Sequence, residues 1–300
     1  MKVLVYGSLN IDLIFSVDHV VRPGETISGK SLTKSAGGKG ANQAAALAKA
    51  GLRVYAAGKI GADGRFLTGL LQSYGVNTEG IVEYKGDTGQ AIIQLDKNRQ
   101  NSIIVYSGGN GAITTEEITR TLAGFGPGDC ILLQNEIVLL KEAITGAKRR
   151  GLAVYFNPSP YDRSIEELPL DMVDMFFVNE IEGAALAAPP EPGKDGADTP
   201  PEILDRLVNR FPDAEIILTV GEKGAYYGRG EIREKADAPD VEVADTVGAG
   251  DTFTGYFIAA RARRFPVSRA LAAACKAAAI SVSRPGAMEA IPLAGEVFNS

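Results

Sequence analysis

The stretch Asp245-Thr246-Val247-Gly248-Ala249-Gly250-Asp251-Thr252-Phe253 joins a predicted strand at Val241 to Val243 to a predicted helix that ends near Arg264. Its glycines permit positive φ and close approach of the backbone to a ligand. Backbone N–H groups at a helix start are unpaired and lie at the positive end of the helix dipole, so the turn is a candidate anion site. Asp251 adds a carboxylate that can take a proton from an attacking hydroxyl, or that merely complements the helix dipole.

A second glycine-rich stretch, Ala36-Gly37-Gly38-Lys39-Gly40-Ala41-Asn42-Gln43-Ala44, opens another predicted helix, which ends near Ala50 before Gly51. Lys39 and Asn42 contribute a cation and an amide that can bond hydroxyl or phosphate groups. Ordinary tight turns use glycine in the same way. Neither stretch by itself therefore identifies a function.

Apolar strand-like runs alternate with helical stretches along most of the chain. The expected strands are Val3 to Tyr6, Val54 to Ala57, Cys130 to Leu133, Ala153 to Phe156, Met175 to Val178 and Ile216 to Thr219. The expected helices are Gly40 to Ala50, Arg65 to Ser73, Thr115 to Ala123, Leu139 to Arg150, Pro201 to Asn209, Asp251 to Arg264 and Ser268 to Ser283. This alternation predicts βαβ units, and hence an α/β fold whose mainly parallel sheet is covered on both faces.

Two stretches without partner helices, about 12–34 and 86–106, have short alternating segments that predict β-ribbons. They are expected to form a small sheet that projects from the core, with an antiparallel edge of the main sheet as the alternative. The chain 1–300 is therefore predicted to be a single domain that contains these two inserted segments. Pro189 to Pro200 is expected to be a solvated loop.

Composition limits the function classes. The chain has 300 residues, of which 45% are hydrophobic and 23% charged, and no apolar run approaches the ~18 residues that span a membrane. Met1 to Tyr6 reads as a buried strand and not as a secretory signal. A net charge of −6 argues against binding to nucleic acid or anionic membranes. The only cysteines, Cys130 and Cys275, are far apart and look buried, which favours a reducing cytoplasm and no disulfide.

Other routes to nucleotide chemistry are absent from the sequence. No Gly-x-x-x-x-Gly-Lys-Ser/Thr loop occurs, no Gly-x-Gly-x-x-Gly follows the first strand, and the protein-kinase motifs are missing. The two cysteines also exclude a cysteine-based zinc site. The sole histidine, His19, lacks ligand spacing and is expected at the surface.

Together, the two glycine-rich stretches resemble the two signatures of the ribokinase family of carbohydrate kinases (PfkB type), at Gly37 to Asn42 and Asp245 to Asp251. Further matching segments follow in family order: Gly7 to Asp12, Pro23 to Thr26, Asn157 to Pro160, Asn179 to Glu182 and Thr219 to Gly224. The resemblance covers essentially the whole chain. It implies a three-layer αβα core with a small β-sheet lid over the sugar, a lid that often makes a dimer contact.

The resemblance implies ATP-dependent phosphorylation of a hydroxymethyl group on a small sugar, with ribose favoured because the ribokinase branch matches best. Ser107 to Asn110 and Gln134 to Glu136 depart from that branch. A fructokinase-like enzyme or a nucleoside kinase is therefore the alternative within the family. A noncatalytic sugar or nucleotide sensor is the alternative from a different functional class. Retention of Asp251 argues against a sensor, because a pure binder needs no base.

The resemblance assigns roles by position. Asp251 is the general base, and the backbone N–H groups of Gly248, Ala249 and Gly250 form the anion hole. The sugar-binding positions, which include Asp251, are Asn10, Asp12, Gly38, Lys39, Asn42 and Glu136. Read from the residues alone, Asn10 and Asp12 cap a turn and Glu136 is an acid at a helix N-terminus.

The remaining implied positions serve the nucleotide and the metal ions. The nucleotide positions are Asn179, Thr219, Gly221, Gly224, Gly250 and Cys275. Glu182 would bind Mg²⁺ through water, although Asn179 and Glu182 also read as a capping box and Cys275 as a small core residue. The positions for a monovalent cation, usually K⁺, are Asp245, Val247, Ser281, Arg284 and Gly286. Ala290 stands where the family often has a hydroxyl residue, so one ligand of that cation is missing.

Overall fold

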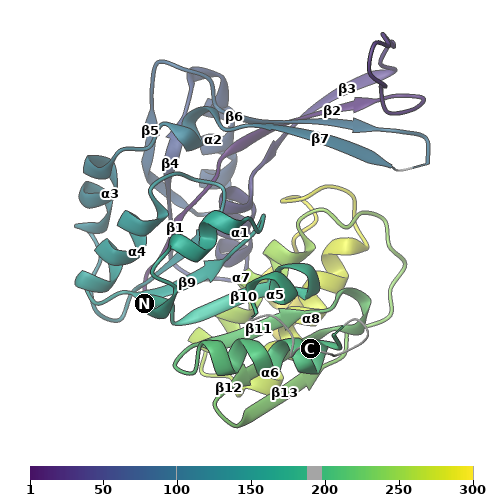
Figure 1. Ribbon diagram of the computed structural model, residues 1–300. Helices are drawn as coiled ribbons and strands as arrows, with labels where there is room; N and C mark the ends of the chain where they lie inside the picture. The colour runs from purple at the N-terminus through teal and green to yellow at the C-terminus, as the bar shows by residue number, and fades with distance from the viewer. Residues whose placement is uncertain (99, 188–197, 300) are drawn as a thin grey trace.

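The computed structural model describes residues 1–98, 100–187 and 198–299, which form a large and a small sheet (Figure 1). The large sheet has nine strands in the order β13-β12-β11-β10-β9-β8-β1-β4-β5. Their bounds are β1 Val3–Tyr6, β4 Val54–Ile60, β5 Asn77–Glu83, β8 Cys130–Gln134, β9 Ala153–Asn157, β10 Met175–Asn179, β11 Glu215–Thr219, β12 Ala225–Arg229 and β13 Ile232–Ala236. Pairing is parallel from β5 to β11 and antiparallel only for β12 and β13, as the predicted alternation requires.

Helices cover both faces of the large sheet. Their bounds are α1 Lys39–Lys49, α2 Arg65–Ser73, α3 Thr115–Leu122, α4 Leu140–Arg149, α5 Glu180–Leu186, α6 Pro200–Arg210, α7 Ala249–Ala262, α8 Val267–Val282 and α9 Ala294–Phe298. Val3 and Val5 of β1 pack in one buried cluster with α1, α7 and α8, whereas Leu4 and Tyr6 pack in a second with α3, α4 and α6. Strand residues alternate between the two faces, so this division confirms three αβα layers.

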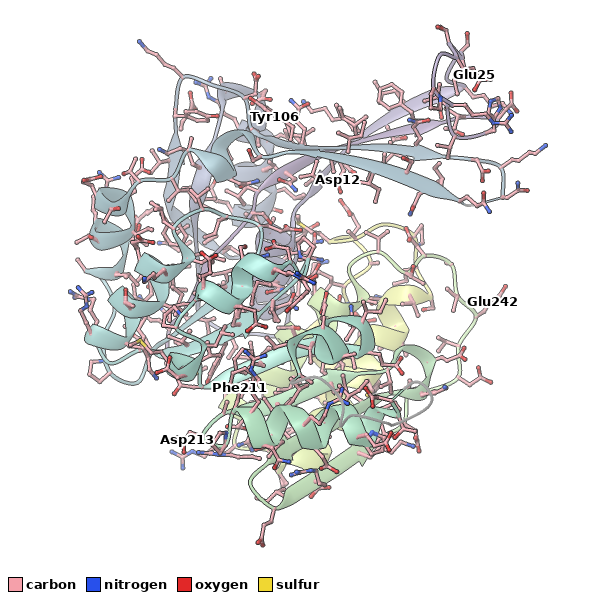
Figure 2. The ribbon with its side chains drawn as sticks, viewed as in Figure 1. Asp12, Glu25, Tyr106, Phe211, Asp213 and Glu242 are labelled. Atoms are coloured by element: carbon pink, nitrogen blue, oxygen red, sulfur yellow. The ribbon has the colours of Figure 1, made fainter. Side chains whose placement is uncertain are left out.

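The small sheet is separate from the large one and projects away from the core (Figure 1). Its order is β3-β2-β6-β7, with bounds β2 Asn10–Ser16, β3 Ser31–Gly37, β6 Gly89–Leu95 and β7 Asn101–Tyr106. In Figure 2, Tyr106 lies where this sheet leaves the core and Glu25 lies at its far end. The prediction of a projecting sheet is confirmed, and the alternative of an edge on the main sheet is wrong.

Three interpretations from the residues alone are wrong. Val241 to Val243 is not a strand: the segment follows β13 in the chain and belongs to neither sheet. Glu242 lies on the outside of the molecule there (Figure 2). Asn10 and Asp12 do not cap a turn, since both lie within β2. Glu136 is not in a helix, because α4 begins at Leu140.

Other features agree with expectation or lie outside the described residues. Cys130 and Cys275 are buried, free thiols. Among the described residues no helix combines the length and the apolarity that a membrane crossing requires. The loop predicted at Pro189 to Pro200 lies mostly outside the described residues, and Pro200 itself begins α6.

Candidate active site

The site is built where polar side chains follow the carboxyl ends of the parallel strands. Gln134, Asn157, Asn179 and Thr219 are the last residues of β8, β9, β10 and β11. The carboxyl ends of adjacent parallel strands share one edge of a sheet, which is where open α/β sheets bind ligands. The N-termini of α1 and α7 bring both glycine-rich stretches to this edge.

Asp251 is held in the first turn of α7 by two amides of α1. Asn42 Nδ2 donates to Asp251 Oδ2 at 3.0 Å, and Gln43 Nε2 donates to Asp251 Oδ1 at 2.9 Å. α7 begins after Gly248, whose φ of 74° lies in the left-handed region that favours glycine. The carboxylate therefore has a fixed orientation in the first turn of α7, beside the glycine turn.

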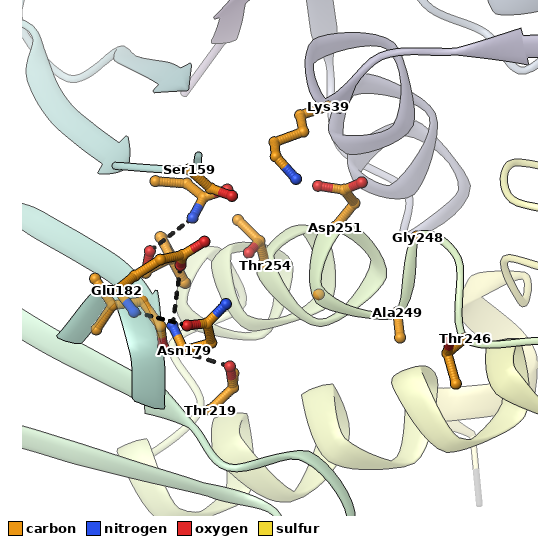
Figure 3. Close-up of a pocket in the computed structure, with 14 residues that line it drawn as sticks. Lys39, Ser159, Asn179, Glu182, Thr219, Thr246, Gly248, Ala249, Asp251 and Thr254 are labelled. Carbon is orange, nitrogen blue, oxygen red and sulfur yellow. Dashed lines mark hydrogen bonds between the residues drawn. The ribbon is translucent and has the colours of Figure 1, made fainter. Parts of the chain in front are cut away.

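Burial and charge act on Asp251 in opposite directions. Asp251 is only 8% exposed, and burial raises the pKa of its carboxyl, while Lys39 and the amides of Gln43 and Asn42 oppose that rise. Burial alone would lower the pKa of Lys39, yet Asp251, Glu136 and Glu182 together raise it. Lys39 thus stays a cation, and it lies across from Asp251 in Figure 3.

A cavity of about 260 Å³ opens beside this pair (Figure 3). Its lining includes the predicted residues Lys39, Asn179, Glu182, Thr219, Gly248, Ala249, Gly250 and Asp251. Asn157, Ser159 and Thr254 also line it, and they had no predicted role. The glycine turn and the two strand ends that carry Asn179 and Thr219 therefore face one space, small enough for phosphate groups.

Asn179 and Glu182 form a reciprocal capping box at the start of α5. Glu182 N donates to Asn179 Oδ1 at 2.8 Å, and Asn179 N donates to Glu182 Oε2 at 3.1 Å. The capping interpretation is confirmed, and the pair nevertheless lines the cavity. In the part of the chain that is described, no three His, Cys, Asp or Glu side chains gather as a metal-binding group. The residues present fit Mg²⁺ that keeps most of its waters, because this ion takes few protein ligands.

A second, larger cavity of about 840 Å³ adjoins the first. Both are lined by Thr219, Thr246, Ala249 and Gly250, so the glycine turn lies between them. Gly221, Gly224 and Cys275, predicted for the nucleotide, line the second cavity together with apolar residues such as Phe253 and Val282. Its size and apolar wall suit a nucleoside.

The polar residues predicted for the sugar lie at the root of the small sheet. Asn110 Nδ2 donates to Asn10 Oδ1 at 2.7 Å, and Lys39 N donates to Glu136 Oε2 at 3.2 Å. Burial, with Glu136 nearby, raises the pKa of Asp12 to about 6. This group is thus a cluster of acids and amides that can pair several hydroxyls.

Gly38 joins β3 to α1 at the same place. Its φ is 91°, and a Cβ there would lie 2.7 Å from the Ser8 carbonyl oxygen. An alanine at this position would therefore be strained and would also clash with the backbone. The glycine lets the start of α1 approach the end of β1 closely enough for Lys39 N to reach Glu136.

The residues predicted for a monovalent cation are brought partly together. Val247 N donates to Asp245 Oδ1 at 3.0 Å, and Gly286 N donates to Asp245 Oδ2 at 3.3 Å. The Ser281 carbonyl oxygen accepts from Arg284 N at 3.1 Å at the end of α8. Ala290 is buried, with 1% exposure, and offers no hydroxyl. Asp245 thus organises the loop, and Ser281 and Arg284 form the adjoining turn.

Sequence reasoning missed the amides behind the site: Gln43, Gln134, Asn157 and Asn110. Gln43 lies beside the predicted Asn42, but its partners Gln134 and Asn157 are 91 and 114 positions away. Asn110 is 100 positions from Asn10. No local pattern signals such pairs, and only Gln134 and Asn157 have a position, at the end of a strand, that indicated they would face the site.

An oriented carboxylate in the first turn of a helix, facing a lysine beside a cavity that adjoins a second, larger one, is the arrangement of a phosphotransferase with an alcohol acceptor. The chain belongs to the pfkB family of carbohydrate kinases, whose profile matches residues 1–294. It is a sugar kinase.

Relatives span nearly the whole chain. It is 33% identical over 300 residues to the ribokinase of Haemophilus influenzae, covering 98% of this chain and 96% of that one. It is 32% identical to the deoxyribokinase of Salmonella typhi, covering 97% and 96%. Among solved structures, the Arabidopsis thaliana ribokinase complexed with ribose and ATP has a TM-score of 0.86 at 29% identity, covering 99% of this chain and 97% of that one.

Proposed function

We propose that the protein transfers the γ-phosphoryl group of ATP to the hydroxymethyl group of ribose, which gives ribose 5-phosphate. The observation that carries this proposal is the Asp251 carboxylate, which Asn42 and Gln43 hold at 3.0 and 2.9 Å beside the glycine turn that separates the two cavities. Similarity to ribokinases, one of them solved with ribose and ATP, supports the choice of substrates.

In this proposal the hydroxymethyl oxygen attacks the γ-phosphorus in line with the bridging oxygen of ATP. The hydroxyl proton passes to Asp251, the new oxygen–phosphorus bond forms, and the bond to the bridging oxygen breaks to release ADP. The N–H groups of Gly248, Ala249 and Gly250 stabilise the charge on the phosphoryl oxygens. Lys39 neutralises part of the remaining charge because its raised pKa keeps it protonated.

ATP would lie across both cavities, with its nucleoside between Gly221, Gly224 and Cys275 and its phosphates beside Gly250 and Asn179. Mg²⁺ would be held through water by Glu182, and when bound it neutralises charge on the β- and γ-phosphates. This arrangement needs no further carboxylate from the protein, which agrees with the sparse acids of the first cavity.

The sugar would lie between Asn10, Asp12 and Glu136 on one side and Gly38, Lys39 and Asn42 on the other. Asn42 Nδ2 is used by Asp251, whereas Asn42 Oδ1 is buried and has no partner. A buried acceptor without a partner is costly, so Asn42 Oδ1 is suited to accept from a sugar hydroxyl. A sugar hydroxyl would therefore bind the same amide group that holds the base.

The proposal includes K⁺ at Asp245, Val247, Ser281, Arg284 and Gly286, with one ligand fewer than usual because of Ala290. Its support is that Asp245 ties Val247 and Gly286 into one loop, next to the helix start that carries Asp251. Rates measured in K⁺ and in tetramethylammonium, at equal ionic strength, test it. A several-fold lower rate in the organic cation is expected, and equal rates would remove the cation from the proposal.

We also propose a homodimer formed through the small sheet, which serves as a lid over the sugar. The edge strand β7 exposes Ile103, Ile104, Val105 and Tyr106 by 49 to 67%. Such an apolar edge is a site of association, because exposed strand edges pair readily. A cytoplasmic location is proposed because two buried free thiols suit a reducing compartment.

A substrate panel tests the function. Coupled ADP release is measured with ribose, deoxyribose, fructose and nucleosides at fixed Mg²⁺ and K⁺. Ribose is expected to saturate at about micromolar to low-millimolar levels with the highest kcat/KM. Preference for deoxyribose, fructose or a nucleoside would replace ribose within the same family, and no ADP release with any acceptor would favour a noncatalytic sensor.

A further inference from the structure

A line of buried amides runs from the sheet to Asp251. Gln134 Nε2 donates to Gln43 Oε1 at 2.6 Å, and Gln43 Nε2 donates both to Asp251 Oδ1 at 2.9 Å and to Asn157 Oδ1 at 3.2 Å. Asn157 Nδ2 in turn donates to the Phe177 carbonyl oxygen at 2.8 Å. The side chains of Gln43 and Gln134 are completely buried. Five elements, β8, β9, β10, α1 and α7, are joined in this way.

The direction of each amide in this line is set by its neighbour. The Phe177 carbonyl can only accept, so Asn157 must face it with Nδ2 and turn Oδ1 toward Gln43. Gln43 must then present Nε2 to Asn157, and the same nitrogen meets Asp251. Its Oε1 is left to face Gln134, which must donate. A flipped amide at Gln43 would place two oxygens against each other at Asn157.

In this arrangement one polar atom of the Gln134 amide makes no hydrogen bond. Gln134 Oε1 is buried and has no hydrogen-bond partner. A Cβ on Gly7 would lie 2.0 Å from that oxygen, so only the absence of a side chain at Gly7 leaves room for it. A buried polar atom without a partner is unusual in a native protein. The Gln134 amide is therefore oriented toward Gln43 even though its oxygen stays unpaired.

We propose that Gln43 and Gln134 are positioning residues for Asp251: Gln43 orients the carboxylate and supplies it with a donor, and Gln134 fixes the direction of the Gln43 amide. This inference rests on the proposed role of Asp251 as the base. A donor to the ionised carboxylate favours that form over the neutral acid. The line of amides therefore keeps a buried aspartate able to accept a proton.

The other charged groups near Asp251 come from three elements: Lys39 at the start of α1, Glu136 after β8 and Glu182 in α5. Lys39 opposes the upward pKa shift of Asp251, while burial and, to a smaller extent, the negative charge of Asp251 raise the pKa of Glu136. None of these three groups changes when either glutamine is replaced by methionine. A shift in the pH dependence of such a variant therefore reports on the amides.

The experiment compares wild type with Gln43→Met, Gln134→Met and the double variant, with Gln72→Met as control. Gln72 donates to Thr78 at 2.8 Å on the far edge of the large sheet, so it tests the loss of an amide hydrogen bond away from the site. Measured quantities are kcat, the KM values for ribose and ATP, the acid limb of kcat against pH, and the urea midpoint.

Gln43→Met is expected to lower kcat by about 10- to 100-fold, the range for losing a hydrogen bond to a charged group. Gln134→Met is expected to lower it several-fold, and the double variant no further than Gln43→Met, because Gln134 acts through Gln43. Both single variants should move the acid limb to higher pH while the KM for ATP stays within about twofold. Gln72→Met should match wild type in kcat.

Two results would overturn the proposal: Gln134→Met with wild-type kcat and an unmoved acid limb, or losses that add in the double variant. Gln134 makes its hydrogen bond to Gln43 and not to Asp251, so the Gln134→Met variant keeps the test valid if Gln43→Met fails to fold. The Asp251→Asn variant distinguishes failure of the positioning role from failure of the proposed function. If Asp251→Asn is inactive while the glutamine variants keep full activity, only the positioning role fails. If wild type phosphorylates no sugar, the proposed function fails as well.

Discussion

Asn42 and Asp251 are 209 positions apart in the chain, yet Asn42 Nδ2 donates to Asp251 Oδ2 at 3.0 Å. The contact joins the N-terminal turns of α1 and α7, the two helices that follow the glycine-rich stretches. The contact therefore brings the Asp251 carboxylate, Lys39 at the start of α1 and the glycine turn at the start of α7 to one space. Each stretch alone is ambiguous, and their meeting makes a phosphoryl-transfer site.

Sugar binding is expected to weaken below about pH 6. Burial raises the pKa of Asp12 to about 6, so Asp12 becomes protonated below that pH and loses its full capacity to accept from sugar hydroxyls. The KM for ribose should therefore rise as pH falls through this value. In Asp12→Asn the KM should be higher at pH 7.5 and should lack that step. A step of equal size in the variant would assign it to another group.

The same pKa shift predicts a change in stability. Folded Asp12 holds its proton up to about pH 6, whereas an unfolded chain releases it near pH ~4. The folded state therefore binds more protons between these values, and its free energy of unfolding from this group falls as pH rises through that window. Asp12→Asn should remove this contribution and be more stable than wild type at pH 7.5 in urea unfolding, and lower stability at that pH would contradict it.

Gly248 and Gly250 flank Ala249. Their substitution by alanine is expected to have different effects, one on stability and the other on ATP binding. Gly248 has a φ of 74°, so Gly248→Ala should reduce the free energy of unfolding by about 1–2 kcal/mol. A Cβ on Gly250 meets nothing within 4 Å, so Gly250→Ala should fold as well as wild type. Its methyl group would enter the space between the two cavities and should raise the KM for ATP.

Gly69 provides a matched control for Gly250. It lies in the helix α2, and a Cβ there also meets nothing within 4 Å. Gly69→Ala should raise the free energy of unfolding by about 1 kcal/mol, because alanine is the better helix former, and should leave the KM for ATP close to wild type. An unchanged KM in Gly250→Ala would mean that ATP does not lie against the turn.

The proposed dimer predicts that charge on β7 separates the subunits. Ile104 and Val105 are neighbours on a strand, so their side chains lie on opposite faces of the small sheet, and they are exposed by 59 and 67%. Light scattering should give a dimer for wild type, and at least one of Ile104→Lys and Val105→Lys should be a monomer. A wild-type monomer, or dimers in both variants, would contradict the interface.

The core strands could be predicted because their apolar runs are continuous, as in Met175 to Val178, which are all buried. The hairpin of β12 and β13 was not predicted. β13 has the sequence Ile-Arg-Glu-Lys-Ala and lies at the edge of the sheet, so it can keep its charged side chains in water and carries little hydrophobic pattern. The opposite error occurred at Val241 to Val243, which alternates in sequence but lies in neither sheet.

The glycine turn could be predicted from its own residues. The glycines and the helix start that together form an anion site are neighbours in the sequence. The polar residues proposed to bind the sugar could not be assigned in this way. Asn10 and Asp12 read as turn caps, and only the family resemblance separated them from that interpretation. Neither the residue pattern nor the family resemblance predicted the line of amides from Gln134 to Asp251. Its hydrogen bonds connect residues that are 91 and 208 positions apart in the chain.

The most direct measurement is the single-turnover rate of phosphoryl transfer to ribose in Asp251→Asn, with ribose binding and urea unfolding measured on the same protein. We expect a rate lower by about 10²–10⁴, with ribose still bound and the fold intact. A rate within a few-fold of wild type, in a variant that folds and binds ribose normally, would contradict it.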